Sequence, residues 1–194
     1  SVVVHAAAGG VGTLAIQLAK AWGAGNVIAV ASTDDKMALA KDLGADSFVL
    51  AGSPTLKEDL QDANGGKKVD IVLEMVGGPT FDASLAALAP FGRLVTFGMA
   101  SRTAPSPVTA GELMSRSRAV IGFWLAHCFG NPELMQLRVQ QYQRWIEANG
   151  AMAQPPQAGP AGMAGPPQGG PPAPGGQPIG GMPGGTNNAA ALGQ

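Results

Sequence analysis

A glycine-rich turn near the start of the sequence is the pattern with the clearest chemistry. Residues 2–5 form a short β-branched run typical of a buried strand, and Gly9-Gly10-Val11-Gly12 follows shortly afterwards. Ala7, Gly9 and Gly12 occupy the three glycine positions of the G-x-G-x-x-G pattern, with alanine in the first. Small residues let the backbone approach a pyrophosphate, and the free N–H groups of the following helix bind that anion. The spacing therefore predicts a dinucleotide site; the alternative is a structural turn without a ligand.

A second polar cluster follows the next strand and indicates which dinucleotide would bind. Sites specific for NADH place an acid at the end of the second strand, where it holds the ribose 2′-hydroxyl. This sequence has Ser32 and Thr33 there, with Lys36 one helical turn further on. Hydroxyls and a lysine suit the 2′-phosphate of NADPH, so we expect NADPH, with NADH as the weaker ligand. Asp34 and Asp35 weigh against this, although both also fit the first turn of a helix, where the dipole favours anions.

The elements that would position these residues alternate between two hydrophobic periods. Short apolar runs indicate strands, and apolar residues at helical spacing, such as Phe81, Leu85 and Leu88, indicate the helices between them. A last helix is expected over roughly residues 132–148. This alternation predicts an α/β fold, a doubly wound parallel sheet of the Rossmann type, with ligands at the carboxyl ends of its strands. About six strands are expected, at residues 2–5, 27–31, 47–50, 69–75, 92–97 and 119–124.

The composition changes sharply near residue 150 and divides the chain in two. All charged residues precede this point, whereas half of the residues after it are Gly or Pro. A segment of that composition cannot bury enough apolar surface to offset the entropy of ordering itself. We therefore expect a dinucleotide-binding domain over residues 1–149 and a disordered tail, rich in Gly, Pro and Ala, over residues 150–194.

Net charge and cysteine content argue against several partners and locations. The formal net charge is −1, and no basic face indicates a nucleic-acid ligand. No apolar run is long and polar-free enough to span a membrane, and the apolar start lacks the cationic residues of a signal peptide. The single cysteine, Cys128, excludes an internal disulfide and fits a reducing compartment, so we expect a cytoplasmic protein.

Several segments, in order and spacing, resemble the medium-chain dehydrogenase/reductase superfamily and most closely its zinc-independent quinone oxidoreductase branch. The resemblance covers residues 1 to about 149, and the motifs are specific only when taken together. They are HAAAGGVG at 5–12, ASTDDKMALAKDLGAD at 31–46, DIVLEMVGG at 70–78, GRLVTFG at 92–98 and GFWL at 122–125.

The resemblance implies cofactor contacts for the pyrophosphate, the 2′-phosphate, the nicotinamide and a closing aromatic pair. In that order they are Ala8, Gly9, Gly10 and Val11; Ser32, Thr33 and Lys36; Val76, Phe97, Gly98 and Met99; and Phe123 and Trp124. Aromatic residues at the end of a strand also fit a core or an interface, and this alternative stays open for the last pair. In the family the last strand pairs with its copy in a second subunit, which implies a homodimer through residues 119–124.

The resemblance also implies an activity, the transfer of hydride from NADPH to a quinone or an α,β-unsaturated carbonyl. In the family a catalytic domain precedes the first strand, so we expect here the cofactor-binding domain without the domain that contacts the small-molecule substrate. No residue is assigned as catalytic, and a tyrosine that helps to hold the cofactor in the family falls near Ala51, which has no hydroxyl. The alternatives are a non-catalytic NADPH-binding module and a non-functional truncated product.

Other chemistry finds little support. A short-chain dehydrogenase needs a Tyr-x-x-x-Lys pair, and the residue four positions after Tyr142 is not lysine. His127 and Cys128 are adjacent, which is poor geometry for joint ligation, so we expect no zinc or other metal. His5 is interpreted as a structural histidine. Glu74 could face the nicotinamide, but we interpret it as an ordinary polar residue that ends the fourth strand.

Overall fold

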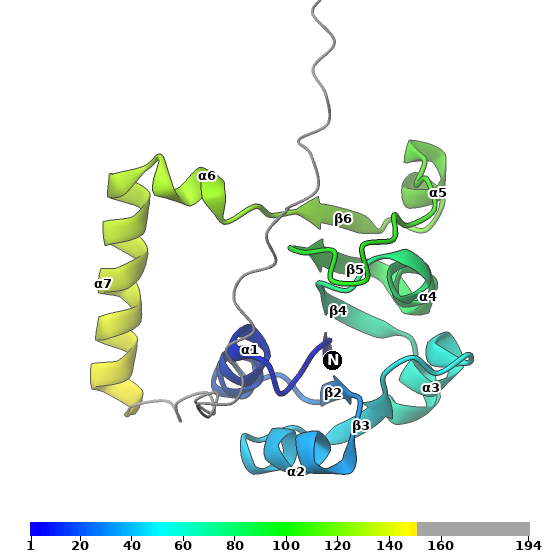
Figure 1. The fold of residues 1–194 in the computed structure, drawn as a ribbon, viewed down its shortest axis with the longest axis horizontal. Coiled ribbons are helices and arrows are strands. Elements are labelled where there is room, and N and C mark those ends of the chain that lie inside the picture. The colour runs from blue at the N-terminus through cyan, green and yellow to red at the C-terminus, as the bar shows by residue number, and fades with distance from the viewer. Residues whose placement is uncertain (151–194) are drawn as a thin grey trace, which may run out of the picture. The chain divides into compact units, whose positions relative to one another are not determined.

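A computed structural model of the chain describes residues 1–150 and contains one parallel sheet of six strands (Figure 1). The strand order is β3-β2-β1-β4-β5-β6, and every neighbouring pair is parallel. This is the doubly wound Rossmann arrangement that the alternating periods predict. The strands are β1 (Val2–Val4), β2 (Val27–Ala31), β3 (Ser47–Leu50), β4 (Val69–Glu74), β5 (Leu88–Thr96) and β6 (Ala119–Gly122).

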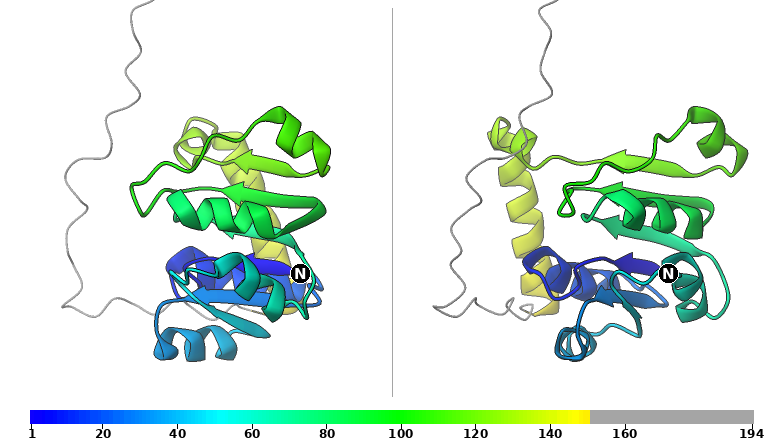
Figure 2. Two further views of the ribbon diagram at one scale, coloured as in Figure 1. Left: turned by 90° about the vertical axis from the view of Figure 1, so that its right-hand side faces the viewer. Right: turned by 45° about the vertical axis from the view of Figure 1, so that its right-hand side comes forward.

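Helices pack on both faces of the sheet, as right-handed crossovers require. The first two helices lie on one face, and the third and fourth lie on the other (Figures 1 and 2). The helices are α1 (Gly10–Ala21), α2 (Asp34–Asp42), α3 (Leu56–Ala63), α4 (Gly78–Ala87), α5 (Ala110–Ser115), α6 (Ala126–Phe129) and α7 (Pro132–Asn149).

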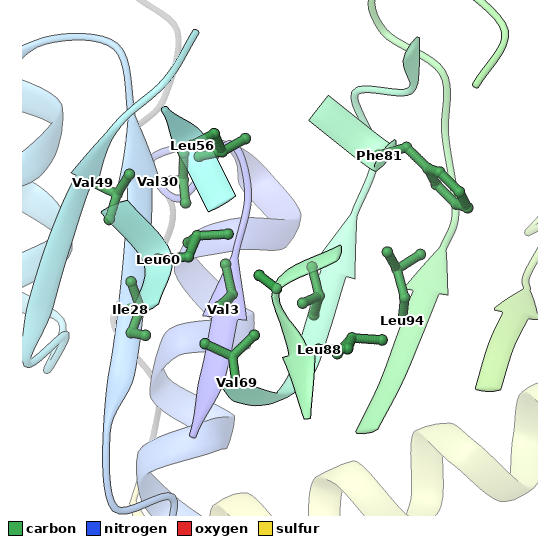
Figure 3. Packing of buried hydrophobic residues seen from close by; sticks show 12 residues of the cluster. Val3, Ile28, Val30, Val49, Leu56, Leu60, Val69, Phe81, Leu88 and Leu94 are labelled. Carbon is green, nitrogen blue, oxygen red and sulfur yellow. The ribbon is translucent and has the colours of Figure 1, made fainter. Parts of the chain in front are cut away.

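Successive residues of the central strands contribute to two separate cores. Val3 packs into the core beneath α3 and α4, whereas the next residue, Val4, packs into the core beneath α1 and α2. A strand points alternate side chains to opposite faces, and burial on both faces explains why β1 and β2 are continuously apolar. Figure 3 shows the core beneath α3 and α4, with Leu56, Leu60 and Phe81 facing the strand residues Val3, Val69 and Leu94.

The fifth strand begins earlier than the sequence predicts. Leu88, which was expected in a helix, instead pairs with Val69 at the start of β5. Residues 89–92 then form an irregularity opposite a single residue of β4. Gly92 tolerates this close approach, because a Cβ there would lie 2.8 Å from Ala89 O. The helical prediction for Leu88 was wrong because its spacing and burial continue the pattern of α4.

The sixth strand is shorter than the predicted 119–124, since β6 ends at Gly122. Phe123 adds one backbone hydrogen bond, from its N–H to Thr96 O at 2.9 Å, before the chain turns into α6, which the sequence did not predict. The final helix, α7, agrees with the expected range. The predicted tail at residues 150–194 lies outside the described residues apart from Gly150. Within the described part of the chain, we find no helix with the length and apolar character needed to cross a membrane.

Candidate functional site

The turn between β1 and α1 packs its backbone tightly. Ala6 has a φ of 50°, and its carbonyl accepts a hydrogen bond of 2.8 Å from Gly9 N. A Cβ on Gly12 would lie 2.4 Å from Ala6 O, so only glycine fits there. Ala7 is fully buried and its N–H donates to Val30 O at 3.1 Å. Alanine in the first position of the glycine pattern therefore fills space beside β2 without disturbing the turn.

The first turn of α1 presents backbone donors without a side-chain cap. Gly9 is the N-cap residue, and the first turn carries no acidic side chain. Thr13 N donates to Gly9 O at 2.9 Å, so the N–H groups of Gly10, Val11 and Gly12 precede the helical ladder and have no partner inside it. A Cβ on Gly10 would meet no atom within 4 Å. Free donors beside open space are what a phosphate group requires.

A cleft of about 430 Å³ opens at the carboxyl ends of β1, β2, β3 and β4. This is the switch point of the sheet, because the chain leaves β1 toward one face and β4 toward the other. Five of the predicted contacts line it: Ala8, Gly9, Ser32, Lys36 and Val76. The remaining lining residues, which were not predicted as contacts, are His5, Ala6, Ala7, Val30, Ala31, Ala51, Gly52, Leu56 and Thr80.

A lysine and a serine form the charged end of the cleft, beside β2. Lys36 Nζ donates to Ser32 Oγ at 3.0 Å, and both residues are exposed. Thr33 does not line the cleft; it is the N-cap residue of α2, and its hydroxyl accepts from Lys36 N at 3.4 Å. Asp34 and Asp35 lie in the first turn of α2 and do not line the cleft either. This placement favours the interpretation of the two aspartates as residues that stabilise the helix start.

The opposite end of the cleft is shaped by the β4–α4 loop, which Glu74 holds from inside the fold. Glu74 has no exposed surface, and its Oε1 accepts hydrogen bonds from Val76 N at 2.6 Å and from Gly77 N at 2.9 Å. Burial raises the pKa of the Glu74 carboxyl, against the lowering effect of these hydrogen bonds. Glu74 ends β4, as predicted, but it is fully buried and is therefore not an ordinary polar residue. A lone acid after an apolar strand carries no local signal of such a role.

The loop after β5 is fastened to the β4–α4 loop. Phe97 N donates to Glu74 O at 3.0 Å, and Ser101 N donates to Val76 O at 2.8 Å. Between them, Gly98 packs so closely that a Cβ would lie 3.1 Å from Met75 O. The predicted contacts Phe97, Gly98 and Met99 thus lie beside the Val76 loop, but they are not on the wall of the cleft.

The two aromatic residues predicted to close over the cofactor follow the edge strand of the sheet. Phe123 is 49% exposed and Trp124 is 62% exposed, and neither lines the cleft. Two strands, β4 and β5, separate β6 from β1 in the sheet. The structure does not bring this pair together with Gly9 or Ser32, so their contact with a cofactor stays a prediction.

His5, directly after β1, contacts helix α4 from inside the fold. It is 2% exposed, and its Nε2 lies within hydrogen-bonding distance of Ser84 Oγ, at 2.9 Å, in α4. Burial lowers the pKa of His5 to about 4, so the imidazole is neutral at pH 7. The structural interpretation of His5 is confirmed, although the residue is also part of the cleft wall. Across residues 1–150 we find no group of three or more His, Cys, Asp or Glu side chains placed to hold a metal ion.

The fold and the turn at the switch point define a nucleotide-binding α/β domain of the dehydrogenase type. A profile of the zinc-binding dehydrogenase family matches residues 10–143. The chain belongs to this family, as a quinone oxidoreductase-like cofactor-binding domain of the medium-chain dehydrogenase/reductase superfamily. The predicted family is thereby confirmed.

Three proteins that the chain resembles are named as reductases or oxidoreductases. The chain is 36% identical to prostaglandin reductase-3 of Mus musculus over 152 residues, which are 74% of this chain and 40% of that protein. It is 41% identical to the quinone oxidoreductase of Salmonella typhimurium over 109 residues, 56% of this chain and 32% of that one. A quinone oxidoreductase from Thermus thermophilus, also solved with NADPH, is 38% identical with a TM-score of 0.57, covering 72% of this chain and 43% of that one. The chain thus spans less than half of the relatives that it matches.

Proposed function

We propose that this chain binds NADPH across its switch point and, in the complete protein, presents it for hydride transfer to a quinone or an α,β-unsaturated carbonyl. The observation that carries the proposal is one cleft lined both by Gly9, the N-cap residue of α1, and by the Lys36–Ser32 pair at its β2 end. A dinucleotide has this same layout, with a pyrophosphate between two nucleosides and, in NADPH, a further phosphate on the adenosine. The solved NADPH complex of the Thermus thermophilus relative supports it.

The phosphates would lie at two places that the chain leaves open. The N–H groups of Gly10 and Val11, with Gly9 and Ala8 beside them, would bind the pyrophosphate, where the helix dipole favours negative charge. At the β2 end, Lys36 would pair with the 2′-phosphate and the Ser32 hydroxyl would donate to it, whereas Thr33 lies outside the cleft wall as the N-cap residue of α2. Ala51 supplies only a methyl group in the same cleft, so it offers the adenosine neither an aromatic ring nor a hydroxyl.

The nicotinamide would lie at the β4 end of the cleft, beside Val76, with residues 97–99 behind that loop. NADPH supplies the hydride when it is bound, so this chain supplies orientation and the exclusion of water. Among the cleft-lining residues only His5 and Lys36 are titratable, and His5 is neutral with its Nε2 bonded to Ser84. This favours a site without its own acid or base, and it keeps a non-catalytic NADPH-binding module as the second candidate function.

The proposal includes a second copy of the chain as partner and a cytoplasmic location. β6 is the edge of the sheet, and large apolar side chains are exposed on and after it. Pairing of β6 with a second copy would cover that edge, which otherwise leaves unpaired backbone groups in water. The exposed residues are Ile121, Phe123, Trp124, Leu125 and Phe129.

A titration with NADPH and NADH, followed by cofactor fluorescence, tests the proposal. We expect NADPH to bind with a micromolar dissociation constant and NADH more weakly. Lys36→Glu should weaken NADPH binding by roughly 30-fold, because a carboxylate would replace the cation beside the 2′-phosphate. Lys41→Glu is the matched control, since Lys41 is an exposed lysine in the last turn of the same helix. Equal binding of both cofactors, or equal effects of the two substitutions, would overturn the assignment.

Turnover separates the two candidate functions. NADPH oxidation in the presence of a small quinone, followed at the absorbance of the reduced nicotinamide, is expected for an oxidoreductase. Tight NADPH binding by the complete protein without oxidation by any quinone or enone would support the binding module.

A further inference from the structure

Glu74 is a buried carboxyl whose two oxygens have different surroundings. Oε1 accepts from Val76 N and Gly77 N, at 2.6 Å and 2.9 Å. Within the described residues Oε2 has no hydrogen-bond partner, although the side chain is fully buried. A buried carboxyl is costly to keep, so its presence at the last position of β4 calls for a compensating function. The two amides that it binds belong to the loop that forms the β4 end of the cleft.

That loop has little freedom of its own. Gly77 and Gly78 have φ values of 80° and 53°, in the region that favours glycine. A Cβ on Gly77 would lie 2.8 Å from Met99 Cγ and 3.0 Å from Thr103 O. The loop is therefore packed between the start of α4 and the chain that follows β5.

The loop is held by hydrogen bonds of two opposite kinds. Its carbonyl groups, Met75 O and Val76 O, accept from Ala100 N at 2.9 Å and from Ser101 N at 2.8 Å. Its amide groups, those of Val76 and Gly77, point the other way and are bound by the Glu74 carboxyl. Without that acceptor two partly or fully buried N–H groups would lose their partner, which proteins rarely tolerate. Glu74 thus holds the amide groups of the loop, whereas the chain after β5 holds its carbonyl groups.

Val76 lines the cleft, and Ser32 and Lys36 line it from the opposite side of β1. A dinucleotide whose pyrophosphate lies at α1 must place its two nucleosides on these two sides. We propose that Glu74 is a positioning residue for the nicotinamide half of NADPH: by binding the Val76 and Gly77 amides it sets the wall against which that half packs. This inference rests on the proposed NADPH function. It predicts that Glu74 affects one half of the cofactor and leaves the other half unchanged.

Binding of NADPH and of 2′,5′-ADP to the same variants tests this, because 2′,5′-ADP contains only the adenosine half. Glu74→Leu removes the acceptor and should raise the dissociation constant of NADPH about tenfold, while that of 2′,5′-ADP changes less than about twofold. Glu74→Gln keeps an acceptor oxygen for both amides, so it should restore most of the NADPH affinity. Val72→Ala is the matched control, since it removes buried apolar atoms from the same strand but leaves the loop contacts intact. It should lower thermal stability, and it should change the dissociation constants of NADPH and of 2′,5′-ADP by the same factor.

Each outcome decides the inference. Equal loss of both ligands in Glu74→Leu, or no loss of either, would overturn it, as would a Gln variant as weak as the Leu variant. If Glu74→Leu does not fold, Glu74→Met replaces it, because its thioether is at most a weak acceptor for the two amides; the same separation of ligands is expected. If the unmodified chain binds 2′,5′-ADP but not NADPH, the inference fails while the adenosine site stands. If it binds neither, the proposed function itself fails.

Discussion

The two ends of the cleft are built in different ways. The end formed by α1 and β2 consists of short continuous segments, residues 6–12 and 32–36, whose contacts are mostly between near neighbours. The end formed by β4 and α4 is held by contacts between segments far apart in the chain, since Met75 O accepts from Ala100 N and Val76 O accepts from Ser101 N. The first kind of site can be recognised as a sequence motif. The second kind depends on tertiary contacts, so its residues carry no pattern of their own.

The largest expected loss of stability is at the end formed by α1 and β2. Gly12→Val should lower the free energy of unfolding by roughly 3 kcal/mol or more, because a Cβ at Gly12 would lie 2.4 Å from a backbone oxygen. Gly10→Ala is its control, since a Cβ at Gly10 meets nothing within 4 Å. Urea unfolding of both variants measures the difference. Similar losses for the two would show that the turn is held less tightly than its geometry indicates.

His5, which lines the cleft and contacts Ser84 of α4, should make stability depend on pH. Its pKa of about 4 in the fold lies below the ordinary histidine value of 6.5, so between these values the unfolded chain binds a proton and the folded chain does not. Stability from His5 is therefore present above pH 6.5 and is lost as the pH falls toward 4, by roughly 3 kcal/mol. Urea unfolding of the wild type and of His5→Gln at pH 7, 5.5 and 4.5 tests this. The variant should lose less stability on acidification, and parallel losses would contradict the assignment.

Burial of Glu74 makes the stability of the fold depend on pH in the opposite direction from burial of His5. Because its pKa is raised in the fold, its stabilising effect is complete at low pH and is lost as the pH rises through the folded-state pKa. The His5→Gln comparison removes this contribution, since Glu74 is present in both proteins.

At the end formed by β4 and α4, Gly77→Ala should lower the free energy of unfolding by about 2 kcal/mol. A φ of 80° disfavours a side chain, and the added Cβ would meet Met99 and Thr103. The expected signature is a larger loss of NADPH affinity than of 2′,5′-ADP affinity, measured by fluorescence titration. Gly66→Ala is the control: its φ is 77°, its Cβ would meet nothing within 4 Å, and it does not line the cleft. If the two variants weaken the binding of NADPH and of 2′,5′-ADP to the same extent, the two ends of the cleft do not act independently.

The smallest expected effect is at the N-cap of α2. Thr33→Ala removes the hydroxyl that accepts from Lys36 N and should lower the free energy of unfolding by about 1 kcal/mol. Thr33→Ser keeps the hydroxyl and should be close to the wild type in a thermal melt. An equally large loss for serine would assign the effect to the Thr33 methyl group and not to the cap.

Sequence reasoning predicted most of the fold because the fold repeats a local pattern. Residues 27–31 and 47–50 were located correctly as strands, since each is a short apolar run bounded by turn residues. Leu88 was placed wrongly because its spacing also fits a helix. Within the cleft, Gly9, Ser32, Lys36 and Val76 were predicted and do line it, whereas His5 and Thr80 were not predicted as contacts. Glu74 was expected to be an ordinary polar residue, because its complete burial depends on the packing of the folded chain and its sequence neighbours do not show it.

The order of the strands has a consequence for folding during synthesis. β1 pairs on one side with β2, the next strand along the chain. On its other side it pairs with β4, where Val4 lies opposite Leu73, a residue much further along the chain. Contacts between distant residues require more loop-closure entropy and form more slowly, and chains emerge from the ribosome N-terminal end first. The first βαβ unit therefore emerges with the far edge of β1 unpaired until β4 appears. A translational pause between Leu50 and Val69 would prolong that interval and expose a hydrophobic edge to misassembly or to a chaperone.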